Sequence, residues 1–401
     1  MCAMAYAQCN KIINGNVASL QVVAGSNWLS LPIISLYDNV PIHISFDELS
    51  HDCKRYAYRI EHCEADWSVS KEIFDSDFCD GFADGNIIED MQSSVNTNTA
   101  YTHYKLTIPN EKCKLKISGN YRVAIYDENE GDTILYATFM VVDPKVSVGM
   151  TAGTNTDIDV NKKHQQIGMT VGYSGLNVSN PTNEIMVTVL QNGYWPDART
   201  NVSPQTIRPD VLEWTHNRQL IFEGGNEYHK FETLDTSHPT LGVENTYWDG
   251  NEYHAELWTS YPRSNYVYDE DANGAFYIRN SDNYENDVAS EYTNVRFRLK
   301  IPKIQNRIYI DGVWTNGEIC SRYEMIYDNE TKLYEKTIRL KQGYYSYRYI
   351  TWDNAKETVM PLSYDGNFYQ TENNYQALVY YRPSGQRTDL LIGYQNIAIK
   401  K

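Results

Sequence analysis

Four side chains that can bind metals or carry protons lie close together: His62, Cys63, Glu64 and Asp66. On a strand alternate residues share a face, so His62, Glu64 and Asp66 would point to one side and Cys63 to the other. A metal site formed by the three is one interpretation. A Cys63 nucleophile activated by His62 is disfavoured because the two side chains point apart. We expect the simpler arrangement, a strand that ends in a polar turn before Trp67, with His62 held by hydrogen bonds and no metal bound.

The common catalytic motifs are missing from the chain. No G-x-S-x-G, H-E-x-x-H, G-x-x-x-x-G-K-[ST] or Rossmann glycine pattern occurs. Carboxylates are plentiful, but no local signature selects two of them as a glycosidase pair. We therefore predict a protein that is not an enzyme and needs no cofactor.

A row of tyrosines gives the sharpest pattern in the C-terminal third. On a strand, Tyr345, Tyr347 and Tyr349 share one face, and Trp314 lies on a turn that could join them. One interpretation is an exposed platform that stacks on sugar rings or on a protein partner. The other is cross-strand packing inside a sandwich, which we favour because large aromatic side chains dominate such cores.

Composition limits the classes of partner. The chain has 401 residues, which suggests two or three domains, and 35 Lys and Arg against 52 Asp and Glu give a net charge of -17. This charge has the wrong sign for binding nucleic acid. No run of 18 apolar residues occurs, so we expect no helix to insert in a membrane. The 34 tyrosines favour strands and half-wet contact surfaces.

The cysteines and the N-terminus bear on the compartment. Seven cysteines, without a C-x-x-C pair, argue against zinc and leave any disulfide pairing open, and most of them suit buried apolar positions. Ala5, Tyr6 and Ala7 form an A-x-A triplet before Gln8. We interpret residues 1–7 as the end of a secretory signal whose start lies upstream, and therefore expect an exported protein.

Turn dipeptides separate many short runs of strand type, which predicts an all-β chain of tandem immunoglobulin-like or early-set β-sandwich domains. In one run Tyr121, Val123 and Ile125 alternate with smaller or polar residues, whereas 185–190 is largely apolar on both faces. Prolines after two strands suggest breaks near 143 and 301. We expect an N-terminal sandwich over 8–143, a middle β-rich domain with long loops over 144–300, and a C-terminal sandwich over 301–401.

Several strings together resemble a known family. These are 56–67, ending in Glu64-Ala65-Asp66-Trp67, then Gly81-Phe82, 94–97, 101–104 and 118–121. Further strings follow at 225–228, 271–274, 340–349, 368–375 and 391–394. As a set they resemble the type IX secretion system plug proteins of Bacteroidota. The chain departs from that pattern at Tyr228-His229, where the family suggests an aromatic residue followed by Arg.

The resemblance implies a periplasmic, non-catalytic β protein. It would dock against the periplasmic mouth of the outer-membrane translocon barrel and close the pore. On this view we place the partner-binding surface at a set of first-domain residues, with the middle-domain loops beside it. The set is His62, Asp66, Trp67, Phe82, Tyr101 and Tyr104. Because the C-terminal portion also resembles early-set and glycogen-binding modules, glycan binding through Trp314, Tyr345, Tyr347 and Tyr349 is the rival hypothesis.

Overall fold

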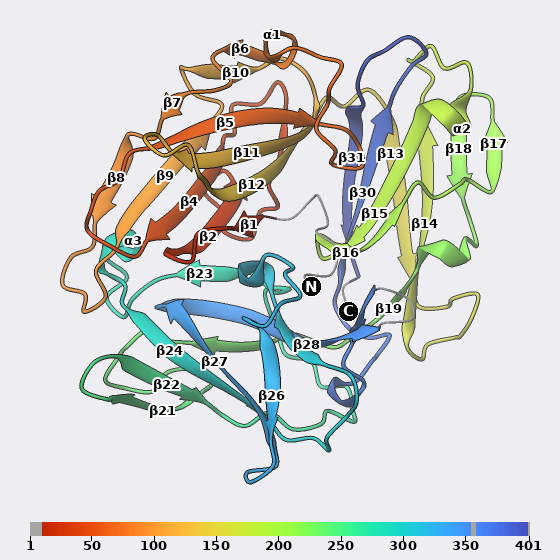
Figure 1. The fold of residues 1–401 in the computed structure, drawn as a ribbon. Helices are drawn as coiled ribbons and strands as arrows, with labels where there is room; N and C mark the ends of the chain where they lie inside the picture. The colour runs from red at the N-terminus through yellow and green to blue at the C-terminus, as the bar shows by residue number, and fades with distance from the viewer. Residues whose placement is uncertain (1–9, 354–357, 400–401) are drawn as a thin grey trace.

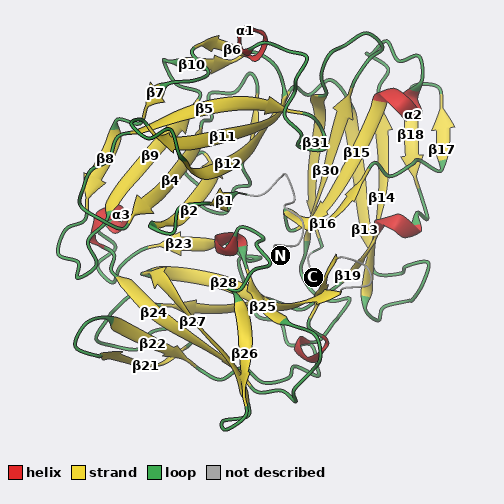
Figure 2. Ribbon diagram, viewed as in Figure 1, coloured by secondary structure: helices red, strands yellow, loops and turns green. Residues whose placement is uncertain are grey.

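The computed structural model describes residues 10–353 and 358–399, and nearly every regular element in this part is a strand (Figures 1 and 2). The expected all-β class is therefore confirmed. The short helices are α1 (Asp75–Phe78), α2 (Pro181–Glu184), α3 (Asn286–Ala289), η1 (Arg218–Leu220), η2 (Val313–Thr315) and η3 (Ser363–Asp365). None of the helices in the described residues has the length and apolar character needed to cross a bilayer. The expected signal remnant at 1–7 lies outside the described residues.

The first group of sheets forms a sandwich over 10–143 that we call unit I. One sheet has the order β1 (Lys11–Ile12), β12 (Thr133–Val142), β11 (Gly119–Asp127), β5 (Tyr56–Cys63), β7 (Asn86–Ile87), with β3 (Ile33–Ser35) parallel to β12. The facing sheet is β2 (Val17–Ala24), β4 (Ile42–Glu48), β9 (Thr102–Ile108), β8 (Asp90–Ser93). The predicted alternation in β11 points Tyr121, Val123 and Ile125 into one shared core.

A small two-stranded sheet, β6 (Cys79–Gly81) with β10 (Cys113–Leu115), closes one end of unit I. A disulfide joins Cys79 to Cys113 across this pair. Of the other described cysteines, Cys63 is buried and Cys53 is exposed. Among the cysteines that the structure describes, this one bridge therefore answers the question of pairing that the sequence left open.

A second sandwich, unit II, takes strands from two distant parts of the chain. Its first sheet is β13 (Ser147–Gly153), β14 (His164–Gly172), β18 (Val211–Trp214), β17 (Thr206–Arg208), with β19 (Ile221–Glu223) beside β14. Its second sheet is β16 (Tyr194–Thr200), β15 (Ile185–Gln191), β30 (Asn374–Tyr381), β31 (Leu390–Ala398). Strand β15 is apolar on both faces because one face packs inside unit II and the other against unit I.

Unit III is built on one long sheet. Its order is β20 (His229–Glu232), β28 (Gly343–Asp353), β25 (Ile308–Asp311), β26 (Glu324–Asp328), β27 (Leu333–Lys341), β24 (Tyr292–Leu299), β22 (Tyr253–Leu257), β21 (Val243–Trp248). Two short strands, β23 (Phe276–Ile278) and β29 (Thr358–Pro361), also pair with β28.

These pairings do not follow the expected division at 300–301. Strand β24 ends at Leu299 and pairs along its whole length with β27, so a boundary at 300 would cut one sheet in two. Strand β30 pairs with β15, which joins the C-terminus to the middle segment. We therefore propose that unit III, 226–371, is inserted in unit II, 144–225 with 372–399.

The three units form a closed triangle in which each contacts both others (Figure 1). Trp67 and Met140 of unit I share an apolar cluster with Leu190 and Tyr380 of unit II. Between units II and III, the Arg348 guanidinium lies 4.4 Å from the centroid of the Tyr194 ring. The third side, between units I and III, is polar.

Candidate functional site: a polar lock between units I and III

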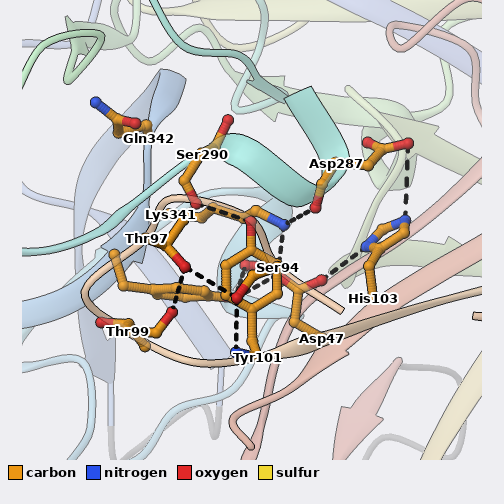
Figure 3. Close-up of polar contacts among 12 residues, drawn as sticks. Asp47, Ser94, Thr97, Thr99, Tyr101, His103, Asp287, Ser290, Lys341 and Gln342 are labelled. Carbon is orange, nitrogen blue, oxygen red and sulfur yellow. Dashed lines mark hydrogen bonds and ion pairs between the residues drawn. The ribbon is translucent and has the colours of Figure 1, made fainter. Parts of the chain in front are cut away.

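A fully buried ion pair joins unit I to unit III. The Lys341 ammonium, at the end of β27, lies 2.6 Å from Asp47 Oδ2 on β4, and both side chains are almost completely shielded from water. Figure 3 shows the two residues surrounded by polar groups from both units. Removing two charges from water is costly. A buried ion pair is therefore stable only where further hydrogen bonds engage the remaining donors of the ammonium and acceptors of the carboxylate.

Asp47 receives two more donors. His103 Nδ1 lies 2.7 Å from Oδ1, and the Tyr292 hydroxyl donates to Oδ2 at 2.7 Å. We call Asp47, His103, Tyr292 and Lys341 the polar lock. Burial alone would raise the pKa of Asp47, but the Lys341 charge and the His103 contact together hold the pKa below its ordinary value. Asp47 is therefore ionised at neutral pH.

Lys341 is satisfied from both units as well. Its ammonium donates to the Asp287 carbonyl at 2.6 Å and lies 4.1 Å from the centroid of the Tyr101 ring. The Tyr101 hydroxyl in turn donates to the Ser290 carbonyl at 2.9 Å. A cation over an aromatic face gains more where water is excluded, as it is here.

A second carboxylate holds the adjoining loop of unit I. Glu291, in the turn before β24, accepts hydrogen bonds from the backbone N–H groups of Asn98 and Thr99. Arg339 also donates to the Thr99 hydroxyl at 2.8 Å. The loop between β8 and β9 is thus tied to unit III by charge-assisted hydrogen bonds, which are stronger than neutral ones.

The lock has no nucleophile activated by a base. Most of its groups satisfy one another, which suits a joint between two units. The exception is His103 Nε2, which has no hydrogen-bond partner among the described residues and lies 3.7 Å from Asp287 Oδ2. Among the described residues no group of three or more His, Cys, Asp or Glu side chains could hold a metal ion.

The structure places the His62 cluster at the end of β5, as a structural joint. His62 is buried, with Nδ1 2.8 Å from the Ser70 hydroxyl and Nε2 donating to the Ser118 carbonyl at 3.2 Å. Burial lowers the pKa of His62, so the ring is neutral. A Cβ on Gly119 would lie 2.2 Å from His62 Nε2, so the ring needs a glycine there. Asp66 is exposed and accepts two hydrogen bonds from Ser68.

The other first-domain residues of the expected surface separate into buried and exposed. Trp67 is 2% exposed and packs edge-on against Trp195 at 5.4 Å. Tyr101 and Tyr104 are buried, Tyr101 in the junction with unit III and Tyr104 stacked on Phe46. Phe82 is 72% exposed. Of this set only Phe82 and Asp66 present their side chains to a partner directly.

The tyrosine row of β28 lies inside unit III. Tyr345, Tyr347 and Tyr349 are each at most 4% exposed, and Trp314 is 7% exposed. Tyr345 stacks between Phe231 and Phe276, at 5.3 and 5.7 Å between ring centroids. The row therefore packs the core, and a sugar ring would find no open face on it.

Sequence reasoning missed the polar lock. Asp47 and Lys341 are 294 residues apart, and no pattern in the sequence links the two. The available signal was a lysine that directly follows the apolar-alternating strand residues Ile338 and Leu340. A lysine is rarely buried without a partner, but the sequence does not say which carboxylate supplies the partner.

Low pH should lower the stability of the fold, because buried carboxylates become protonated. Burial would raise the pKa of Asp365, but His229 and Arg263 lower it to about 2, and the pKa of Asp47 is also lowered. A carboxylate whose pKa is lower in the folded than in the unfolded protein stabilises the fold at any pH above its unfolded pKa, which is near 4. This contribution is lost as the pH falls from the unfolded pKa through the folded pKa. We expect the free energy of unfolding to fall steeply below about pH 4. Urea titrations at pH 3, 5 and 7 measure it.

The matched variant for acid sensitivity is Asp365→Asn. It should be less stable than the natural chain at pH 7 but should lose less stability between pH 5 and 3. An equal loss in both chains would contradict the role of Asp365.

The chain is an all-β assembly in which a buried polar lock joins units I and III. Residues 17–143 match the family model described as the type 9 secretion system plug protein 1st domain. The chain therefore contains the first domain of this plug protein family, and the expected family is confirmed over these residues.

The chain is similar to a solved structure over nearly its whole length. A crystal structure of a hypothetical protein from Parabacteroides merdae ATCC 43184 shares 35% sequence identity and has a TM-score of 0.94, covering 98% of this chain and 99% of that chain. The C-terminal domain of the Streptococcus pyogenes antigen I/II-family protein AspA has 7% identity and a TM-score of 0.18, over 94% and 98% of the two chains, and carries no structural inference. No curated protein matches the sequence. Family membership supports a role related to type IX secretion in the cell envelope.

Proposed function

We propose that this protein binds the periplasmic mouth of the outer-membrane translocon barrel and closes its pore without catalysing a reaction. The observation that carries the proposal is the match of the first domain, 17–143, to the plug protein model. A plug acts by occupying space and adhering, so it needs a stable contact surface and not a catalytic group. The expected partner, location and lack of turnover all follow from that role.

The closed triangle of units supports the proposal mechanically. A protein that closes a pore must keep its shape. Units joined by small, polar interfaces move relative to one another, whereas units with well-filled interfaces do not. Here the junctions are filled by the polar lock on one side and by the apolar cluster around Trp67 and Met140 on another. The three units therefore offer a partner one rigid outer surface.

We place the docking surface at the disulfide-closed end of unit I. Phe82 follows β6, Phe74 precedes α1, and the two side chains are 72% and 73% exposed. The disulfide between Cys79 and Cys113 holds β6 and β10 beside them. A specific interface needs on the order of 1,000 Å² or more of buried surface, with aromatic anchors near its centre.

The proposal is tested by capture of partners from the envelope. Tagged protein added to detergent-solubilised outer membrane should recover the translocon barrel, identified by mass spectrometry. Membranes from a strain without the barrel should yield none. In a strain that lacks this protein, cells should become more permeable to large dyes. An unchanged permeability together with no barrel recovered would refute the proposal.

Replacing Phe82 with alanine should weaken barrel binding at least about tenfold, because an exposed aromatic anchor contributes more than 1 kcal/mol only where a partner covers it. Surface plasmon resonance against the purified barrel measures this. Thermal unfolding should be unchanged, since Phe82 contributes little to the core of the free protein. Tyr284→Ala is the control, because Tyr284 is 68% exposed but lies on unit III. Equal binding by the natural chain and Phe82→Ala would remove this end of unit I from the interface.

A further inference from the structure

Two adjoining cavities lie where the three units meet. Their volumes are about 140 and 660 Å³. They share a set of lining residues that comes from every unit. The shared residues are Val22, Leu31, Pro32, Ile33, Asn192, Asn273 and Val313. We call the two together the central cavity; their combined size falls within the range of small-molecule sites.

Three Asn-Gly turns converge on the smaller cavity. They are Asn192-Gly193 from unit II, and Asn273-Gly274 and Asn316-Gly317 from unit III. All six residues have positive φ, which Asn and Gly tolerate. Trp67 enters from unit I, also with positive φ, which is rare for a bulky residue. The wall is thus made of turns that present amide groups.

Two buried polar atoms in this wall have no hydrogen-bond partner among the residues that the structure describes. They are Trp67 Nε1, a donor, and Asn316 Oδ1, an acceptor. The side chains are 2% and 8% exposed, and both line the smaller cavity. An unsatisfied buried polar group costs roughly 1–3 kcal/mol, so such groups call for a missing partner. One atom donates and the other accepts, so the partner must offer both an acceptor and a donor.

The charges of the lining residues limit which class of ligand the central cavity can bind. Among the described residues that line the central cavity there is no Lys, Arg or His. Its two carboxylates are already engaged: Asp311 accepts from Arg348 at 2.9 Å, and Asp271 accepts from the Asn273 N–H at 2.6 Å. Burial also raises the pKa of Asp271 to about 7. With no cation to receive it, an anionic ligand such as a phosphate is disfavoured.

The remaining wall combines aromatic rings with amides. Trp67 and Trp195 line the smaller cavity, and Trp28 lines the larger one. Further carboxamides line the larger cavity, namely Gln21, Asn374, Gln376 and Asn396. A ring with an apolar face and hydroxyls that both donate and accept complements such a wall.

We propose that the central cavity binds a neutral saccharide unit, whose hydroxyls pair with Trp67 Nε1 and Asn316 Oδ1 and whose ring lies among the tryptophans. This site differs from the buried tyrosine row of β28. Because all three units contribute to it, occupation would stabilise the closed triangle. The proposal stands whether or not the chain closes a pore, since it rests on the cavity alone.

The test is saturation-transfer NMR of the full chain with glucose, galactose and N-acetylglucosamine, and with glucuronate and glucose 6-phosphate as charged counterparts. At least one neutral sugar should bind and the charged ones should not. Trp67→Phe keeps the ring but removes the donor, and Asn316→Gly removes the acceptor but keeps the backbone conformation. Each variant should weaken binding about five- to tenfold, the usual value of one hydrogen bond.

Trp214→Phe is the matched control, because Trp214 is also buried but donates to the Val202 carbonyl in the core of unit II. It should bind the sugar as the natural chain does. Crystals soaked with the bound sugar should show it at Trp67 and Asn316. The proposal is overturned if no neutral sugar binds, if Trp67→Phe and Asn316→Gly both bind the sugar as tightly as the natural chain does, or if soaked crystals hold only water or a peptide segment there.

Discussion

Replacing Lys341 with methionine should lower the free energy of unfolding by about 3–5 kcal/mol, because Asp47 would be left buried without its counter-charge. The loss should appear in urea titrations at pH 7, and heat should unfold the variant earlier. Hydrogen exchange should also accelerate in 94–101 and 286–292, since these segments meet at the lock. Methionine keeps most of the volume of the lysine stem, so the effect reports charge and not a cavity.

Two further variants make this result specific. Asp47→Asn combined with Lys341→Met removes both charges, and a double-mutant cycle should give a coupling of at least about 1 kcal/mol. Lys112→Met is the same substitution in the exposed pair with Glu89, where we expect no measurable change. If Lys341→Met were as stable as Lys112→Met, the polar lock would not hold units I and III together.

Replacing Tyr345 with alanine should cost about 3–5 kcal/mol, as for other large aromatic side chains removed from a core. The ring stacks on Phe231 and Phe276, and its hydroxyl donates to the Lys341 carbonyl at 2.6 Å. Tyr345→Phe keeps the ring and loses only that hydrogen bond, so its cost should be about 1 kcal/mol. Chemical unfolding of the two variants measures the difference.

The same two variants distinguish the two hypotheses for the tyrosines of β28, packing in the core and an exposed sugar-binding platform. A tyrosine that packs a core loses stability when truncated, whereas a tyrosine on an open platform loses retention on immobilised α-glucan at unchanged stability. An unchanged unfolding curve for Tyr345→Ala, together with lost retention, would restore the platform hypothesis for β28.

Much of the fold could be predicted from alternation of residue types. Strand β11 shows why: its apolar period of two fixes which face is buried, and the structure has Tyr121, Val123 and Ile125 on that face. The run over 185–190 was apolar on both sides and lies between two packed layers. These features depend on neighbours along the chain, which the sequence displays directly.

Strand partners could not be predicted in the same way. Alternation fixes the face of a strand but does not identify the strand beside it, and β15 pairs with β30 almost two hundred residues away. The expected division at 300–301 relied on a proline after a strand, but Pro302 follows β24 without ending its sheet. A local break signal therefore cannot distinguish a loop from a domain boundary.

The candidate site depends on the same kind of long-range information. Phe82 could be selected from the sequence and is exposed, whereas His62 and Tyr101 were selected and are buried. The polar lock needed the pairing of Asp47 with Lys341, which only the tertiary structure supplies. Exposure and distant contacts, not residue type, decide which side chains meet a partner.

The insertion of unit III in unit II sets the order in which the molecule can be completed. A chain that emerges from its N-terminus can finish unit I first, because all strands of that sandwich lie before 144. Strand β15 then waits with one edge unpaired until β30 has been made. Unit II is therefore completed by the last strands of the chain. A chain released before β30 is made would leave the backbone N–H and C=O groups along one edge of β15 unpaired and open to proteases and to pairing with other copies.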